Sequence, residues 1–308
     1  MLLMSQLHID IARNSTDDFN LFHDKSRWHW LRGNPFEGPI ALSFQLGCFI
    51  EYQCRLLAMN STSEIDTDQF RFSAYEFSFA NCVRPDDEVT LSVKSGKWSS
   101  GEGPSTYSRR LILKANKKPA IVGFKRDGNQ MTLPLPSNLP PMHMLNNLPD
   151  RELVPGTKYF LKRKYMIVGN AKNFLASAGA EQSLFIDEFA DKVDFPEMYP
   201  LGLISSALLE RALFEDIDLI SHPMIYVSQK LCIDKQQLEE LRSNDAINIL
   251  VGPDISEDAN QFGPESSSKK RVTQECVAYA NEDTPLFIAK LSLIPLNSLI
   301  NKSSDELE

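Results

Sequence analysis

The stretch "GPIALSFQLGCFIEYQCRLLA", residues 38–58, decides the fold of the first half of this chain. From Ser43 to Met59 no proline interrupts it, and apolar residues cover most of a helical circumference. A helix that is hydrophobic on nearly all sides must be wrapped by other elements. The pattern therefore predicts one long, buried helix over 43–59.

Segments rich in β-branched and aromatic residues follow this helix, as is typical of strands. They are "YEFSFANCV" (75–83), "VTLSV" (89–93), "RLILKA" (110–115) and "AIVGF" (120–124). Short turns between them favour antiparallel pairing. A curled antiparallel sheet around one apolar helix is the economical way to bury both, so the prediction is an α+β unit.

The same order of elements recurs in the second half of the chain. An apolar helix is predicted from Leu203 to Phe214, after a proline and a small residue, as in the first half. Three segments align with their first-half counterparts: "YPLGLISSALLERALFEDI" (199–217) with 38–58, "RSNDAINILV" (242–251) with "RPDDEVTLSV" (84–93), and "ANEDTPLFIAK" (280–290) with "ANKKPAIVGF" (115–124). The chain therefore encodes one structural unit twice.

A segment rich in proline and asparagine, 131–156, lies between the two copies. Proline-dense segments stay extended and outside sheets, so this one is predicted to be a linker. The expected division is an N-terminal domain 1–130, a linker 131–156 and a C-terminal domain 157–308. The Gly/Ser/Pro-rich segments 95–108 and 252–270 are predicted to be loops.

Composition narrows the function classes. The net charge of −9, without a long basic run, argues against a nucleic-acid partner. The five cysteines form no C-x-x-C pair, which argues for reduced thiols rather than a disulfide framework or a metal site. The chain has neither a stretch of ~18 apolar residues nor a secretory signal pattern, so we expect a cytoplasmic protein with no membrane partner.

One polar segment, "DDFNLFHDKSRW" (17–28), combines an acid and a histidine. Asp18 and His23 stand five positions apart, with Asn20 between them. An Asp-x-Asn cluster before a helix is often only a cap or an Asx turn. Taken alone, the segment leaves open whether this is a catalytic pair or a polar turn.

Three elements of the first half, taken in order, resemble the MaoC-like (R)-specific enoyl-CoA hydratases, a hotdog-fold family. Residues 17–23 resemble the family signature G-D-x-N-P-x-H. The stretch from Gly38 resembles G-x-I-A-H-G-M-L at the start of the central helix, and 79–89 resembles F-x-x-P-V-x-P-G-D-x-V. The resemblance covers roughly residues 10–125 and implies a double hotdog, in which two copies of a central helix are each wrapped by a curled sheet.

The chain departs from the family pattern at specific positions. Leu21 replaces the signature proline and Asp17 the preceding glycine. Leu42-Ser43 replaces the His-Gly pair, whose glycine amide holds the thioester carbonyl in the family. The second copy is degenerate, because Ala180 aligns with Asp18 and Phe185 with His23.

The resemblance implies hydration or dehydration of an acyl thioester, carried by coenzyme A or acyl carrier protein, with no further cofactor. Asp18 would be the base acting on water, and His23 would orient that water and relay the proton. Asn20 would hold the loop. The N–H groups of Ser43 and Phe44 would receive the thioester carbonyl.

Arg27 and Arg32 flank the aromatic run "RWHW" (27–30) and are candidates for contact with a coenzyme A phosphate. The alternative is that this run is a packed corner.

Two other functions stay open. The Leu42-Ser43 departure and the degenerate second copy favour an inactive hotdog that binds acyl thioesters or acts in assembly. A thioesterase would use Glu51 or Asp18 to activate water. For Glu51 and Glu210 we otherwise expect surface salt bridges. Because hotdog sheet edges are commonly paired, a homodimer is also an open expectation.

Overall fold

The computed structural model describes residues 1–60, 65–99, 105–257, 271–281 and 283–300. The helices are α1 (Gln6–Thr16), η1 (Leu21–His23), η2 (Trp28–Trp30), α2 (Ser43–Asn60), α3 (Met142–Leu145), α4 (Val168–Ser177), η3 (Gln182–Leu184), η4 (Glu188–Ala190), α5 (Met198–Gly202), α6 (Ile204–Phe214), α7 (Lys235–Glu240) and α8 (Asn297–Ile300), where η marks a 3-10 turn. The strands are β1 (Leu2–Leu3), β2 (Phe72–Phe79), β3 (Glu88–Val93), β4 (Lys97–Trp98), β5 (Thr106–Ala115), β6 (Lys118–Gly128), β7 (Glu152–Leu153), β8 (Phe160–Tyr165), β9 (Ile186–Asp187), β10 (Lys192–Val193), β11 (Met224–Asp234), β12 (Ala246–Val251), β13 (Ile255–Glu257), β14 (Arg271–Tyr279) and β15 (Phe287–Pro295).

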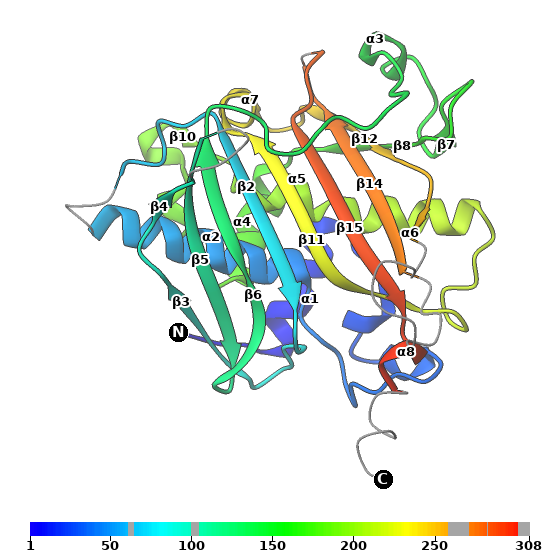
Figure 1. Ribbon diagram of the computed structural model, residues 1–308, viewed down its shortest axis with the longest axis horizontal. Coiled ribbons are helices and arrows are strands. Elements are labelled where there is room, and N and C mark those ends of the chain that lie inside the picture. The colour runs from blue at the N-terminus through cyan, green and yellow to red at the C-terminus, as the bar shows by residue number, and fades with distance from the viewer. Residues whose placement is uncertain (61–64, 100–104, 258–270, 282, 301–308) are drawn as a thin grey trace.

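One large antiparallel sheet runs through both halves of the chain, with α2 and α6 lying behind it (Figure 1). Within the described residues the strand order is β1-β3-β5-β6-β2-β11-β15-β14-β12-β8-β7. The two halves meet where β2 pairs with β11, from Ser78 opposite Ser228 to Phe72 opposite Asp234. Read outward from this junction, the order β2-β6-β5-β3 mirrors β11-β15-β14-β12. The predicted α+β double hotdog is confirmed.

The predicted repeat is confirmed element by element. Helix α2 begins at the predicted Ser43, and α6 spans Ile204–Phe214, one residue shorter than predicted. The gap-free match of 84–93 with 242–251 places β3 and β12 at equivalent positions of the two segments. Because a shift of one residue would turn every side chain of a strand to the other face, a gap-free sequence match predicts equivalent strand positions.

Two expectations for the first half were incomplete. The strand predicted over 75–83 ends at Phe79, because the chain then turns and the Val83 carbonyl accepts a hydrogen bond from the Ala41 amide at 2.8 Å. Helix α1 was not predicted at all. It starts with a capping box at Ser5 and packs against α4, but its buried positions include Ser15 and Thr16, so it shows no clear apolar stripe.

The expectation that 131–156 stays outside the sheet was wrong. Strand β7 within it pairs with β8, and apolar side chains of the segment cover the outer face of the second half, among them Met131, Leu133, Leu139, Met142 and Leu148. The domain limits 1–130, 131–156 and 157–308 stay predictions.

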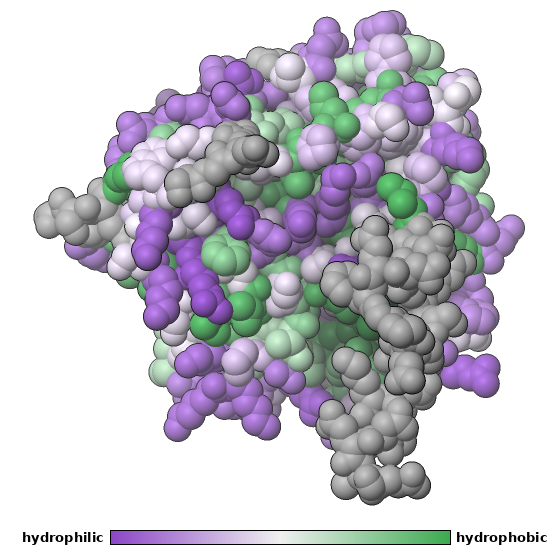
Figure 2. All heavy atoms as spheres, viewed as in Figure 1, coloured by the Kyte–Doolittle hydropathy of each residue, from purple (hydrophilic) through white to green (hydrophobic). Residues whose placement is uncertain are grey.

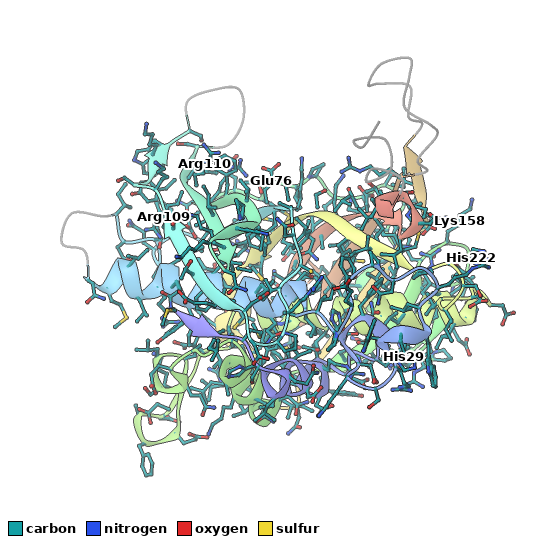
Figure 3. The ribbon with its side chains drawn as sticks, turned by 90° about the horizontal axis from the view of Figure 1, so that it is seen from below. His29, Glu76, Arg109, Arg110, Lys158 and His222 are labelled. Carbon is teal, nitrogen blue, oxygen red and sulfur yellow. The ribbon has the colours of Figure 1, made fainter. Side chains whose placement is uncertain are left out.

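Among the described residues, no such segment covers the outer face of the first half. Hydrophilic side chains cross it (Figure 2). On this face Glu76 accepts a hydrogen bond from Arg126 at 2.8 Å and lies 3.6 Å from Lys230. Successive side chains of each strand point to opposite faces of the sheet, as the buried Arg109 and the exposed Arg110 on β5 illustrate (Figure 3).

The predicted loops 95–108 and 252–270 contain β4, the start of β5 and β13, and their residues 100–104 and 258–270 lie outside the described residues. None of the helices within the described ranges combines the length and the apolar character that a membrane span requires.

Candidate active site

The acid–histidine segment folds as two successive Asx turns after α1. Asp17 ends the helix with φ of 56°, a left-handed conformation that glycine favours and Asp tolerates. The Asp18 carboxylate accepts from the Asn20 amide at 2.8 Å, and the Asn20 side chain accepts from the Phe22 amide at 3.1 Å. The polar-turn and the catalytic interpretations are therefore compatible, because the turns bring Asp18 and His23 together.

The hydrogen bonds of His23 define its protonation. Its Nδ1 lies 2.7 Å from the carbonyl oxygen of Ile40, which can only accept, so Nδ1 carries the proton. Burial lowers the pKa of His23 below 6.5, and this outweighs the opposing influence of the Asp18 charge. A neutral imidazole then presents Nε2 as an acceptor, 3.9 Å from Oδ2 of Asp18. Asp18 and His23 are only 4% and 8% exposed.

The start of α2 presents backbone donors to the same region. Amides in the first turn of a helix have no acceptor within the helix, so the N–H groups of Ser43 and Phe44 can bind a ligand oxygen. The approach to this turn is fixed from both halves. Val83 holds the Ala41 amide, and Gln229 of β11 donates from Nε2 to the Ser43 hydroxyl at 2.7 Å.

One cavity of about 730 Å³ collects these groups. Its lining includes all five residues predicted for the chemistry: Asp18, Asn20, His23, Ser43 and Phe44. Their catalytic roles stay predictions, but the fold brings the acid–histidine segment and the start of α2 to the same cavity. Within the described ranges no three His, Cys, Asp or Glu side chains are grouped so as to hold a metal ion.

Of the two arginines predicted to contact phosphate, one lines the cavity and the other does not. Arg27 lines the cavity, with its guanidinium paired to Asp24 at 2.7 Å. Arg32 is exposed and does not line it, so the structure does not bring this residue to the site. Figure 3 shows His29 of η2 and His222 at the same end of the molecule, and of these two only His222 lines the cavity.

The second half supplies the wall that the sequence did not predict. Helix α6 contributes Leu208, Leu209, Ala212 and Leu213, and the segment after it contributes further apolar side chains. Helix α6 has 11 residues and α2 has 18, so α6 ends earlier. The chain that follows α6 borders the cavity. The volume lies in the upper part of the ~300–1,000 Å³ range typical of small-molecule sites.

Three polar residues of the second half were also missed: Ser205, Tyr226 and Gln229. Ser205 and Tyr226 line the cavity, and Gln229 reaches it through Ser43. Burial, and then the charge of Asp18, raise the pKa of Tyr226, which therefore stays protonated. No local pattern marks these residues, since they gain their meaning only from the pairing of the two halves.

The expected surface salt bridge of Glu51 was wrong. Glu51 is buried, and its carboxylate accepts from the amides of Glu197 and Met198 at 2.8 and 3.0 Å. Glu210 does form ion pairs, with Lys162 at 3.0 Å and Arg151 at 2.9 Å, but its side chain is only 11% exposed. Neither glutamate lines the cavity.

The equivalent region of the second half is packed. Ala180 and Phe185, which align with Asp18 and His23, are both buried. Met198 is fully buried against α2, and a Cβ added at Gly47 would lie 2.8 Å from its sulfur. Close packing of this kind leaves the degenerate copy without the space as well as without the side chains.

Comparisons with known proteins agree with this architecture. No family model and no curated protein matches the sequence. Among solved structures, the chain is similar to a MaoC-like dehydratase (12% identity, 94% of each chain covered, TM-score 0.58). It is also similar to a putative MaoC domain protein dehydratase from Chloroflexus aurantiacus (10% identity, 96% of this chain and 92% of that one, TM-score 0.60).

A third similar structure is a conserved hypothetical protein from Mycobacterium tuberculosis described as having a double hotdog fold (11% identity, 96% of this chain and 93% of that one, TM-score 0.57). At these identities the likeness concerns the fold. The chain is a double hotdog with the architecture found in MaoC-like dehydratases.

Proposed function

We propose that this protein hydrates 2-enoyl thioesters, or dehydrates the corresponding 3-hydroxyacyl thioesters. One observation carries the proposal: the Asp18 carboxylate and the unprotonated Nε2 of His23 lie 3.9 Å apart in the cavity that also receives the start of α2. This separation is too long for a direct hydrogen bond but suits one water that donates to both atoms.

In the proposed reaction the water oxygen forms a bond to C3 of the enoyl thioester while Asp18 takes its proton. The electron pair of the C2–C3 double bond moves to the thioester oxygen, where the N–H groups of Ser43 and Phe44 stabilise the negative charge. When the enolate collapses, the proton taken by Asp18 passes through Nε2 of His23 to C2, so both side chains return to their starting protonation. Proton transfers of this kind are each typically worth roughly 10²–10⁴-fold in rate.

The acyl group would lie along α6. The wall formed by Leu208, Ala212 and Leu213 is apolar, and the cavity is larger than a four-carbon acyl group needs. We therefore expect longer or bulkier acyl groups to be better substrates than crotonyl. The carrier, the cytoplasmic location and a homodimer stay predictions.

A second candidate function is binding without turnover. Leu42, which stands where the family has histidine, is 3% exposed and offers no polar group beside the helix start. If the protein is a thioesterase, Asp18 is the remaining candidate for activating water, because Glu51 does not line the cavity.

The test is the decay of enoyl-thioester ultraviolet absorbance with crotonyl-CoA and 2-octenoyl-CoA. Asp18→Asn and His23→Ala should each lose roughly 10²–10⁴-fold in rate. Asp17→Asn and His29→Ala are matched controls, since both residues are exposed and neither lines the cavity, and they should keep the wild-type rate.

Saturable binding of octanoyl-CoA with no decay of either enoyl thioester would contradict the hydratase proposal and favour the binding protein. Release of free coenzyme A thiol, lost in Asp18→Asn, would instead identify a thioesterase.

A further inference from the structure

We infer that Tyr226, from the second half, is a specificity-determining residue whose hydroxyl donates a hydrogen bond to the oxygen on C3 of the hydrated thioester. The inference rests on the proposed function and names how the site recognises the 3-hydroxyacyl form. Tyr226 lines the same cavity as Asp18 and His23.

A β-bulge lies directly beside this side chain. The register between β11 and β15 shifts between Tyr226 and Ser228, which leaves Val227 as an extra residue. Met224, Ile225, Tyr226 and Val227 all line the cavity, so this end of β11 borders it along its whole length. Bulges often re-aim a side chain beside an active site. No such shift is present where β2, the equivalent strand, pairs with β6.

Ser205 supports the Tyr226 hydroxyl. It is the second residue of α6, so its counterpart in α2 is Phe44, and the second half has a hydroxyl where the first has an aromatic ring. Ser205 is buried and lines the cavity. The Ser205 hydroxyl is hydrogen-bonded to the Tyr226 hydroxyl. A hydroxyl can accept one hydrogen bond while it donates another, so Tyr226 can accept from Ser205 and donate to a ligand.

The chemistry of the pair explains why a donor is needed at C3. The ionised Asp18 carboxylate and Nε2 of neutral His23 can only accept, which suits a water with two protons. After addition to C3 the same oxygen has one proton left and two lone pairs. A phenolic O–H can satisfy a lone pair that neither Asp18 nor His23 can. The second half is thus inferred to supply a functional hydroxyl, although its own acid–histidine pair is lost.

The experiment is equilibrium binding by titration calorimetry in a His23→Ala background, which keeps ligands from reacting. The probes are octanoyl-CoA and the two enantiomers of 3-hydroxyoctanoyl-CoA. Adding Tyr226→Phe should weaken binding of one 3-hydroxy enantiomer about tenfold and change octanoyl-CoA binding less than about twofold. Tyr199 is a buried tyrosine outside the cavity, so adding Tyr199→Phe instead should leave the affinities for all three probes unchanged.

An equal loss for all three probes, or no loss, would overturn the inference. If wild-type enzyme hydrates 2-octenoyl-CoA while Tyr226→Phe leaves 3-hydroxyoctanoyl binding intact, the role of Tyr226 fails and the proposed function stands. If the background variant binds none of the three probes and wild type does not turn over, both fail. Thermal unfolding of each variant shows that the protein is folded.

Discussion

The two halves of the molecule present the same architectural position in opposite states. Around Asp18 and His23 the core is hollow, and the first turn of α2 borders the cavity. Around Ala180 and Phe185 the core is solid, and α5 runs directly into α6 through Leu203, which keeps a helical conformation. The difference teaches that a hotdog half becomes a site through open volume and an uncovered helix start, in addition to its side chains.

A buried polar network joins the two halves beside the packed region. Glu197 accepts from the Tyr75 hydroxyl at 2.8 Å and from the Ser73 hydroxyl at 3.1 Å, while Lys125 pairs with Asp127. Burial opposes the charge of Lys125, but the Asp127 carboxylate outweighs it and raises the lysine pKa. Charges buried this deeply need such partners, so the network fixes the packed state.

Outside the acid–histidine pair, the uncovered helix start gives the largest expected effect. Ser43→Pro removes one backbone donor at the first helical position, where proline fits. Loss of an oxyanion donor typically costs about 10²–10³-fold in kcat. Ser43→Ala keeps the amide and loses only the hydroxyl bonded to Gln229, so it should retain most activity. Steady-state hydration of 2-octenoyl-CoA measures both. Equal activity of the proline and alanine variants would mean that this amide holds no substrate oxygen.

More of the fold than of the candidate site could be predicted from the sequence. Helix α2 and strands β3 and β12 follow from local apolar patterns, and repetition doubled the evidence for them. Asp18 and His23 could be predicted as candidates because their segment is contiguous and resembles a signature. Tyr226 and Gln229 could not be found, because their positions depend on a strand junction and a bulge that no short pattern encodes. Burial of Glu51 was missed because its partners are backbone amides of a distant segment.

A smaller effect is expected from opening the packed half. Met198→Ala should lower the free energy of unfolding by roughly 2–5 kcal/mol, because a fully buried side chain leaves a cavity against α2. Met144→Ala, at a position 39% exposed on α3, should cost much less. Urea unfolding measures the difference. The hydration rate per folded molecule should not change in either variant. A Met198→Ala protein as stable as wild type would show that the packed half tolerates empty space.

The last effect separates the packed region from the cavity by pH. Burial, followed by the Glu197 charge, raises the pKa of Glu51 from 4.5 to about 8. A carboxyl whose folded pKa lies above its unfolded pKa binds more protons when folded, so stability falls as pH rises from about 4.5 to about 8. In Glu51→Gln this loss, on the order of a few kcal/mol, should disappear. The free energy of unfolding of the variant should therefore rise relative to that of wild type between pH 5 and pH 9.

Urea unfolding at both pH values measures the slope, with Glu37→Gln, an exposed carboxyl, as the control that keeps the wild-type profile. Parallel pH profiles for wild type and Glu51→Gln would contradict a buried proton on Glu51. Because His23 and Asp18 lie in the open cavity, the pH dependence of hydration should be the same in Glu51→Gln and wild type. The packed region around Glu51 and the cavity around His23 would then titrate independently, the first affecting stability and the second the chemistry.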